Sequence, residues 1–297
     1  MNLSRSTSRD SFQFATGNSI TKQTENVYKP VHFFLLILVI TWASEFTAAY
    51  FSYQKALAGI AMLCMLPGLF APFIGALIMI RGPQNKWLRQ DYWARLSLKK
   101  IKLSYLPAIL LIMPFALFLA TALSLLFGQS ADQFRFSSGF SIVAGQVWLS
   151  LLIAFLAPAF EELGWRGYGV DSLRSRFSFA KTTLLFGVLW ALWHLPLFFV
   201  NGYYNHELWE TSIVYVINWV AQIFVAALLL NWVYYKNNRS IVAPILFHFM
   251  FVLFSELFQT EQFTKCIITI ILLAIASVII LRDKGFFLHS EGKFQGS

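Results

Sequence analysis

The chain has 297 residues, of which 58% are hydrophobic and only 12% are charged, and its mean hydropathy is +0.62. Soluble domains carry about 25% charged residues, so this composition excludes a soluble globular protein and indicates an integral membrane protein. The formal net charge is +9. In a membrane protein such an excess reflects topology and contact with anionic lipid, so we expect a bilayer and no nucleic acid as partner.

Residues 1–30 are rich in Ser and Thr and lack the apolar core of a signal peptide, which predicts a disordered cytoplasmic tail. An all-α, polytopic membrane domain is predicted over residues 31–282, followed by a second cytoplasmic tail at 283–297. A spanning helix needs about 20 mostly apolar residues. Eight runs meet this requirement, at 31–53, 57–80, 104–127, 141–168, 179–200, 211–235, 240–258 and 263–282.

The distribution of Lys and Arg supports eight spans. If the tails and connections are assigned alternately to the two sides, 20 of the 23 basic residues fall on the side of the termini. Because cytoplasmic loops carry the excess of basic residues, both termini are expected to be cytoplasmic. The connection at 81–103 holds seven of these residues together with Trp87, Tyr92 and Trp93. It is predicted to be an amphipathic segment on the inner leaflet.

Isolated polar residues in the other runs are interpreted as structural. Glu45 lies near the predicted outer end of the first run, where an interfacial carboxylate is expected. Asn218 and Gln222 are spaced i, i+4 in the sixth run, which favours hydrogen bonding between helices. Cys64 and Cys266 have no metal-binding or redox spacing and are interpreted as small core residues.

The fourth run carries the most unusual group, Glu161 and Glu162 followed by Arg166. The helical pattern continues to about Arg174, and Glu162 and Arg166 have the i, i+4 order that favours an ion pair. Two later apolar runs carry His194 and His248. Ionisable groups in membrane segments usually face the interior of the bundle and mark function. We therefore predict that these five side chains form one buried site.

The chemistry of this set leaves several functions open. A carboxylate with imidazoles in an apolar cavity suits general acid–base catalysis. Two histidines and a carboxylate also fit a catalytic zinc site with one position open for water. The chain has no His-Glu-x-x-His, Gly-x-Ser-x-Gly or phosphate-loop motif. From these residues alone, catalysis and proton-coupled transport are equally supported.

Three motifs in order resemble those of the CAAX-protease and bacteriocin-processing (CPBP, or Abi) family of intramembrane endopeptidases. Glu161-Glu162-Leu-Gly-Trp165-Arg166 is similar to the first motif of this family, Glu-Glu-x-x-x-Arg. Trp190-Ala-Leu-Trp-His194 resembles the second, Phe-x-x-x-His, and the segment ending in Phe-His248 resembles the third. The resemblance covers a motif core at about residues 140–258. It implies an endopeptidase that hydrolyses a peptide bond of a membrane-associated substrate.

The resemblance also implies the role of each site residue. Glu161 would be the general base that activates water, and Glu162 and Arg166 would hold and tune it. His194 and His248 would either polarise the water or, together with Glu161, bind a metal such as Zn²⁺. Both schemes stay open at this point, so the expected enzyme is a metallo- or glutamate-dependent CAAX-type protease.

Two positions depart from the family pattern. Trp190 stands where Phe is usual, which we interpret as a small change in packing. The third motif normally reads His-x-x-x-Asn, and Val252 stands in the place of the Asn, which is thought to donate to the developing oxyanion. Losing one such donor typically costs about 10²–10³ in rate. The possible substitutes near this position are Ser255, Asn218 and Gln222.

The sequence therefore predicts an intramembrane endopeptidase that acts near the inner leaflet, in a bacterial inner membrane. Family members trim prenylated C-termini, process peptides or confer bacteriocin immunity, and no residue here selects among such substrates. The alternatives are a non-catalytic or weakly catalytic immunity or scaffold protein that Val252 has disabled, and a proton-coupled transporter.

Overall fold

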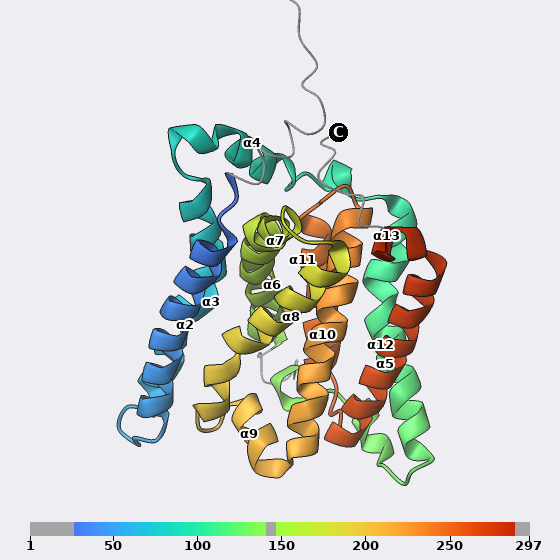
Figure 1. Ribbon diagram of the computed structural model, residues 1–297. Helices are drawn as coiled ribbons and strands as arrows, with labels where there is room; N and C mark the ends of the chain where they lie inside the picture. Colours follow the sequence, from blue (N-terminus) through green and yellow to red (C-terminus); the bar gives the residue numbers. More distant parts are fainter. Residues whose placement is uncertain (1–26, 141–146, 289–297) are drawn as a thin grey trace, which may run out of the picture.

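The computed structural model describes residues 27–140 and 147–288 (Figure 1). The predicted tail up to residue 26, the first six residues of the predicted run at 141–168, and the predicted tail from residue 289 lie outside the described residues. The described part of the chain is helical and contains no strands, which confirms the all-α prediction.

Seven described helices are long and apolar enough to cross a membrane. They are α2 (Pro30–Ser52), α3 (Ala58–Ile80), α5 (Leu106–Leu125) with the preceding turn from Leu103, α6 (Val147–Gly164) with its continuation, α8 (Phe179–Trp193) with η7 (Leu195–Phe199), α10 (Ile213–Lys236) and α12 (Gln262–Arg282). The eighth predicted run forms α11 (Val242–Glu256), which has only 15 residues. It is shorter than the about 20 residues that a full span needs.

Short elements cap the two ends of the bundle. The basic connection forms η1 (Pro83–Asn85), the amphipathic α4 (Lys86–Ala94), η2 (Leu98–Lys100) and η3 (Leu103–Tyr105). Figure 1 shows α4 at the same end as α13 (Lys284–Leu288), while α9 (Tyr204–Thr211) lies at the opposite end. Before α6, the chain forms the single turns η4 (Ala131–Phe134) and η5 (Ser138–Phe140). The predicted amphipathic segment is thus present as α4.

The helix that carries the two adjacent glutamates is continuous from α6 to residue 174. A π-helical turn, η6 (Trp165–Gly169), links α6 to α7 (Val170–Arg174), which confirms that the helix continues to Arg174. Such π-helical turns often occur at functional sites. Close packing holds this region in place, because a Cβ atom on Gly164 would lie 2.2 Å from the backbone carbon of Pro72 in α3. Glycine at 164 allows the two backbones this approach.

A buried ion network closes the bundle at the end that carries α4. Asp171 of α7 is fully buried and pairs with Arg95 at 2.8 Å and with Arg239 at 2.6 Å. The hydroxyls of Tyr234 and Tyr235 also donate to this carboxylate. Burial by itself lowers the pKa of the Arg95 guanidinium, but Tyr234 and Asp171 outweigh burial and the pKa is raised. The network therefore stays charged and ties α4, α7 and α10 together.

Candidate active site

Glu162 and Arg166 form the ion pair that their spacing predicts. Arg166 Nη1 donates to both carboxylate oxygens of Glu162 at 2.8 Å. His248 of α11 approaches the same carboxylate, with Nδ1 2.9 Å from Glu162 Oε1. The side chains of Glu162 and Arg166 are completely buried. The arrangement compensates the charge of Glu162 on two sides and joins α6 to α11.

Asn231 of α10 completes this cluster, and sequence reasoning missed it. Its Oδ1 accepts from Arg166 Nη2 at 3.0 Å, while its Nδ2 donates to Thr183 Oγ1 at 3.1 Å. The guanidinium also lies 4.8 Å above the centre of the Phe186 ring. An Asn within an apolar helix is a signal of interhelical hydrogen bonding. Its partners come from other helices, so the chain order does not reveal them.

Glu161 has different surroundings from its neighbour Glu162. Its Oε2 accepts hydrogen bonds from Trp190 Nε1 at 2.9 Å and from Trp165 Nε1 at 3.3 Å. The interpretation of Trp190 as a small change in packing is therefore wrong, because phenylalanine has no N–H to donate. Trp190 holds one oxygen of Glu161 from the opposing helix α8. Two indole N–H groups, from α8 and from the helix of Glu161 itself, thus hydrogen-bond this carboxylate.

The rings of both histidines lie close to the indole of Trp190. Their ring centres are 5.8 Å (His194) and 5.5 Å (His248) from that of the indole. The described hydrogen bonds of both rings use Nδ1, since His194 Nδ1 contacts the carbonyl oxygen of Trp190 at 2.9 Å and His248 Nδ1 contacts Glu162. These bonds orient the rings and direct the Nε2 atoms away from the anchoring groups.

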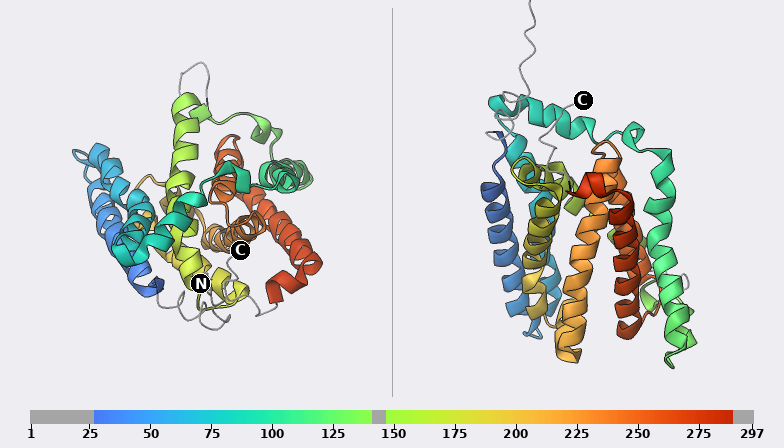
Figure 2. Two further views of the ribbon diagram at one scale, coloured as in Figure 1. Left: turned by 90° about the horizontal axis from the view of Figure 1, so that it is seen from above. Right: turned by 45° about the vertical axis from the view of Figure 1, so that its right-hand side comes forward.

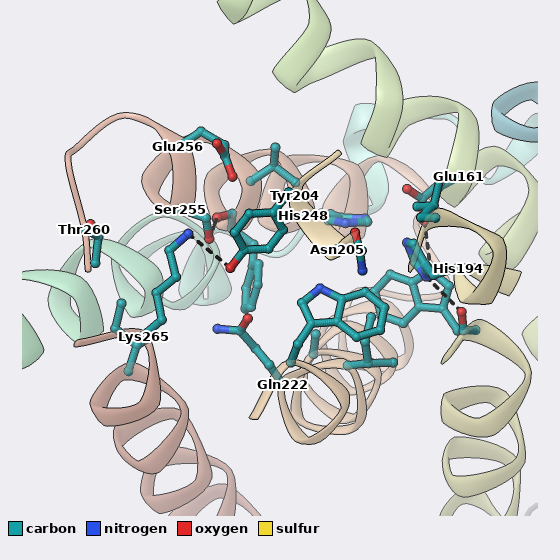
Figure 3. Close-up of a pocket in the computed structure, with 18 of the residues that line it drawn as sticks. Glu161, His194, Tyr204, Asn205, Gln222, His248, Ser255, Glu256, Thr260 and Lys265 are labelled. Carbon is teal, nitrogen blue, oxygen red and sulfur yellow. Dashed lines mark hydrogen bonds between the residues drawn. The ribbon is translucent and has the colours of Figure 1, made fainter. Parts of the chain in front are cut away.

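A cavity of about 240 Å³ receives three of the five predicted side chains: Glu161, His194 and His248 (Figure 3). Glu162 and Arg166 lie behind its wall. At the far end, Lys265 Nζ donates to Tyr204 Oη at 3.2 Å. Burial, together with the charges of Glu45, Glu161 and Glu256, raises the pKa of the lining residue Tyr203 to about 12, so that its phenol stays protonated at neutral pH. The cavity can hold a polar chain segment beside a carboxylate and two imidazoles.

The predicted metal ligands His194, His248 and Glu161 have donor atoms that suit Zn²⁺. However, no group of three His, Cys, Asp or Glu side chains within 27–140 and 147–288 is arranged to hold a metal ion. The described hydrogen bonds of the two histidines use Nδ1 and those of Glu161 use Oε2, so both Nε2 atoms and Glu161 Oε1 take no part in them. The zinc prediction therefore stays a prediction.

The position that departs from the third motif faces the same cavity. Val252 lines it, as do the predicted substitutes Ser255 and Gln222, whereas Asn218 is not among its lining residues. Ser255 Oγ donates to the Phe251 carbonyl oxygen at 2.8 Å within α11. A further lining residue, Asn205 of α9, was not singled out in the sequence. It lies between the second and third motifs and belongs to neither, so no motif pointed to it.

Glu45 is not the interfacial carboxylate that was predicted. It is only 4% exposed, and a Cβ atom on Gly68 would lie 3.0 Å from its Oε1. α3 packs closely against α2 at this glycine, and this packing removes the carboxylate from solvent.

Comparison with known proteins shows the family to which the chain belongs. A family model described as type II CAAX prenyl endopeptidase Rce1-like matches residues 143–254, which contain all five predicted site residues. The chain is 44% identical over 266 residues to CAAX prenyl protease 2 of Methanococcus maripaludis, a match that covers 89% of this chain and 98% of that protein. Neither match favours the immunity, scaffold or transporter alternatives. The chain therefore belongs to the family of CAAX prenyl endopeptidases and is a CAAX-type intramembrane endopeptidase.

Proposed function

We propose that Glu161 is the general base of this endopeptidase and that His194 and His248 orient the water and the substrate. The observation that carries this assignment is the contrast between the adjacent carboxylates. Glu162 pairs with Arg166 and contacts His248 Nδ1 behind the wall, whereas Glu161 lines the cavity with two imidazoles and has indole N–H donors on one oxygen. A general base needs a free oxygen within reach of water.

In the proposed reaction, one proton of a water molecule passes to Glu161 while the water oxygen bonds to the scissile carbonyl carbon. The carbonyl π electrons move to the oxygen and form a tetrahedral oxyanion. The carbonyl then reforms, the C–N bond breaks with its electron pair going to nitrogen, and Glu161 returns its proton to that nitrogen. One water is consumed, and a carboxylic acid and an amine are released.

The substrate that we propose is a peptide with a covalently attached prenyl group, as the name of the relative from Methanococcus indicates for that protein. A second, apolar cavity of about 710 Å³ supports this proposal. It is lined by Leu192, Leu195, Phe198, Phe199, Trp219 and Phe224, among others. Trp219 also lines the cavity of Glu161. A lipid chain in one cavity would thus place its peptide in the other.

The test compares cleavage of a farnesylated peptide with cleavage of the same peptide without the lipid, by purified protein in lipid nanodiscs. We expect the prenylated peptide to have the higher kcat/KM, and we expect both Glu161→Gln and His194→Ala to lower kcat strongly, the first by about 10²–10⁴. Equal cleavage of both peptides would contradict the proposed substrate, and full activity of Glu161→Gln would contradict the proposed base.

The zinc prediction is tested in the same preparation by metal analysis. A glutamate-dependent enzyme should contain no stoichiometric metal and should keep its activity after treatment with a chelator. Bound zinc that is lost from the His194→Ala variant would instead favour a metallopeptidase.

For localisation we propose a plasma membrane with both termini on the cytoplasmic side, on the basis of the distribution of Lys and Arg. Single cysteines introduced at Gln84 and Glu207, in a background without Cys64 and Cys266, should react with a membrane-impermeant thiol reagent from opposite faces. Labelling of both from one face would contradict this topology. Gln84 precedes α4 and Glu207 lies in α9, at opposite ends of the bundle (Figure 2).

A further inference from the structure

Hydrolysis of a peptide bond places negative charge on the carbonyl oxygen, and an active site needs a hydrogen-bond donor for it. We infer that the side-chain amide of Asn205 supplies this donor, an inference that rests on the proposed function of Glu161. Asn205 lines the cavity from α9 and is only 3% exposed. Its role would be to stabilise the oxyanion.

The first observation behind this inference is that the amide donor is unused. Asn205 Nδ2 is buried and has no hydrogen-bond partner among the described residues. Buried polar groups are nearly always hydrogen-bonded, so each exception needs an explanation. Because Asn205 lines the substrate cavity, a bound substrate can supply the missing acceptor. An oxyanion donor is expected to lack an acceptor when no substrate is bound, and Asn205 Nδ2 meets this expectation.

The second observation is the position of the amide within the cavity. Figure 3 shows Asn205 in the part of the cavity that holds His248, His194 and Glu161, whereas Thr260 lies at the end of Lys265. Thr260 Oγ1 is the other lining atom that is buried without a partner in the described structure. It lies away from the proposed base, so it does not compete for this role.

The third observation is that the other lining residues near His248 do not offer a free hydrogen-bond donor for the oxyanion. Val252 is apolar, and the hydroxyl of Ser255 already donates to the carbonyl oxygen of Phe251. Gln222 lines the cavity from α10, nearer to Lys265 in Figure 3. Asn205 combines an available N–H with the right location.

Neighbouring contacts anchor the backbone that carries this amide. His206 Nε2 lies 2.9 Å from the hydroxyl of Tyr53, at the end of α2, and Tyr204 Oη donates to Gln262 Oε1 of α12 at 3.2 Å. The residues on both sides of Asn205 are thus tied to different helices. A donor that is fixed before the reaction stabilises the transition state without a reorganisation cost.

The test uses steady-state cleavage of the farnesylated peptide by wild type, Asn205→Ala and the nearly isosteric Asn205→Leu. We expect kcat to fall about 10²–10³-fold in both variants, with KM changed by less than about threefold, because the donor acts on the transition state. Asn218→Ala serves as the matched control, since this amide lies on α10 outside the cavity, and it should cleave like wild type.

A rescue experiment separates this role from a structural one. Val252→Asn places an amide on α11 in the same cavity. The double variant with Asn205→Leu should therefore have a kcat at least tenfold higher than Asn205→Leu alone. In the wild-type background, Val252→Asn should change kcat much less. A loss of kcat that Val252→Asn does not restore would overturn the inference, as would wild-type kcat in both Asn205 variants. If wild type does not cleave, or cleaves without Glu161, the proposed function fails first and the inference fails with it.

Discussion

Two buried carboxylates lie ten residues apart on the continuous helix 147–174, and their surroundings differ. Asp171 is fully buried and accepts hydrogen bonds from Arg95, Arg239 and two tyrosines. Glu161 has two indole N–H groups on one oxygen and a cavity beside it. The first carboxylate is enclosed by cations and ties α4, α7 and α10 together. The second has no cationic partner among its described contacts.

The difference shows how a membrane protein separates structural charge from chemical charge. A charge in an apolar environment must be compensated. At Asp171 both carboxylate oxygens accept hydrogen bonds, so this carboxylate serves to connect helices. Incomplete compensation, as at Glu161, leaves an oxygen that can accept a proton. One helix holds both, with the π-helical turn η6 between them.

The largest expected effect concerns Glu161 itself. Glu161→Gln should lower kcat by about 10²–10⁴, because the amide cannot accept the proton of water, while the thermal unfolding midpoint stays near that of wild type. Peptide cleavage and unfolding are measured on the same preparation. A large loss of stability would show that Glu161 has a structural role like that of Asp171, which would contradict the proposed difference between them.

The next largest effect is expected at Asp171, where a substitution should lower stability. Asp171→Ala should lower the free energy of unfolding by about 3–5 kcal/mol, because Arg95 and Arg239 would then share the single carboxylate of Asp91. Denaturant unfolding in micelles measures this change. The control is Asp132→Ala, which removes the exposed pair with Arg135 and should leave stability nearly unchanged. Equal effects of the two variants would contradict the structural role of the network.

The smallest expected effect concerns the hydrogen bond from Trp190 to Glu161. Trp190→Phe removes the 2.9 Å bond to its carboxylate. A hydrogen bond to a charged group contributes about 1.5–3 kcal/mol, so we expect kcat to fall about 10- to 100-fold with little change in KM. Trp42→Phe is the matched control, because the indole of Trp42 donates to the carbonyl oxygen of Leu192 outside the cavity. Unchanged kcat in Trp190→Phe would show that packing alone matters at this position.

The local features of this protein could be predicted from its sequence. Apolar run length and the placement of Lys and Arg indicated a polytopic helical protein. The i, i+4 spacing of Glu162 and Arg166 predicted their ion pair, and the helical pattern placed the end of their helix near Arg174. These features depend on interactions between residues that are neighbours along the chain, so periodicity and spacing reveal them.

Only the tertiary structure decided which groups meet across helices. The bond from Trp190 to Glu161, the contact of Asn231 with Arg166 and the burial of Glu45 join segments that are 29, 65 and 23 residues apart in the chain. The unpaired amide of Asn205 beside the cavity depends on how α9 returns to the bundle. In an apolar chain almost every helix face is hydrophobic, so periodicity does not state which face meets which. Packing at small residues such as Gly164 and the pairing of buried polar groups decide it.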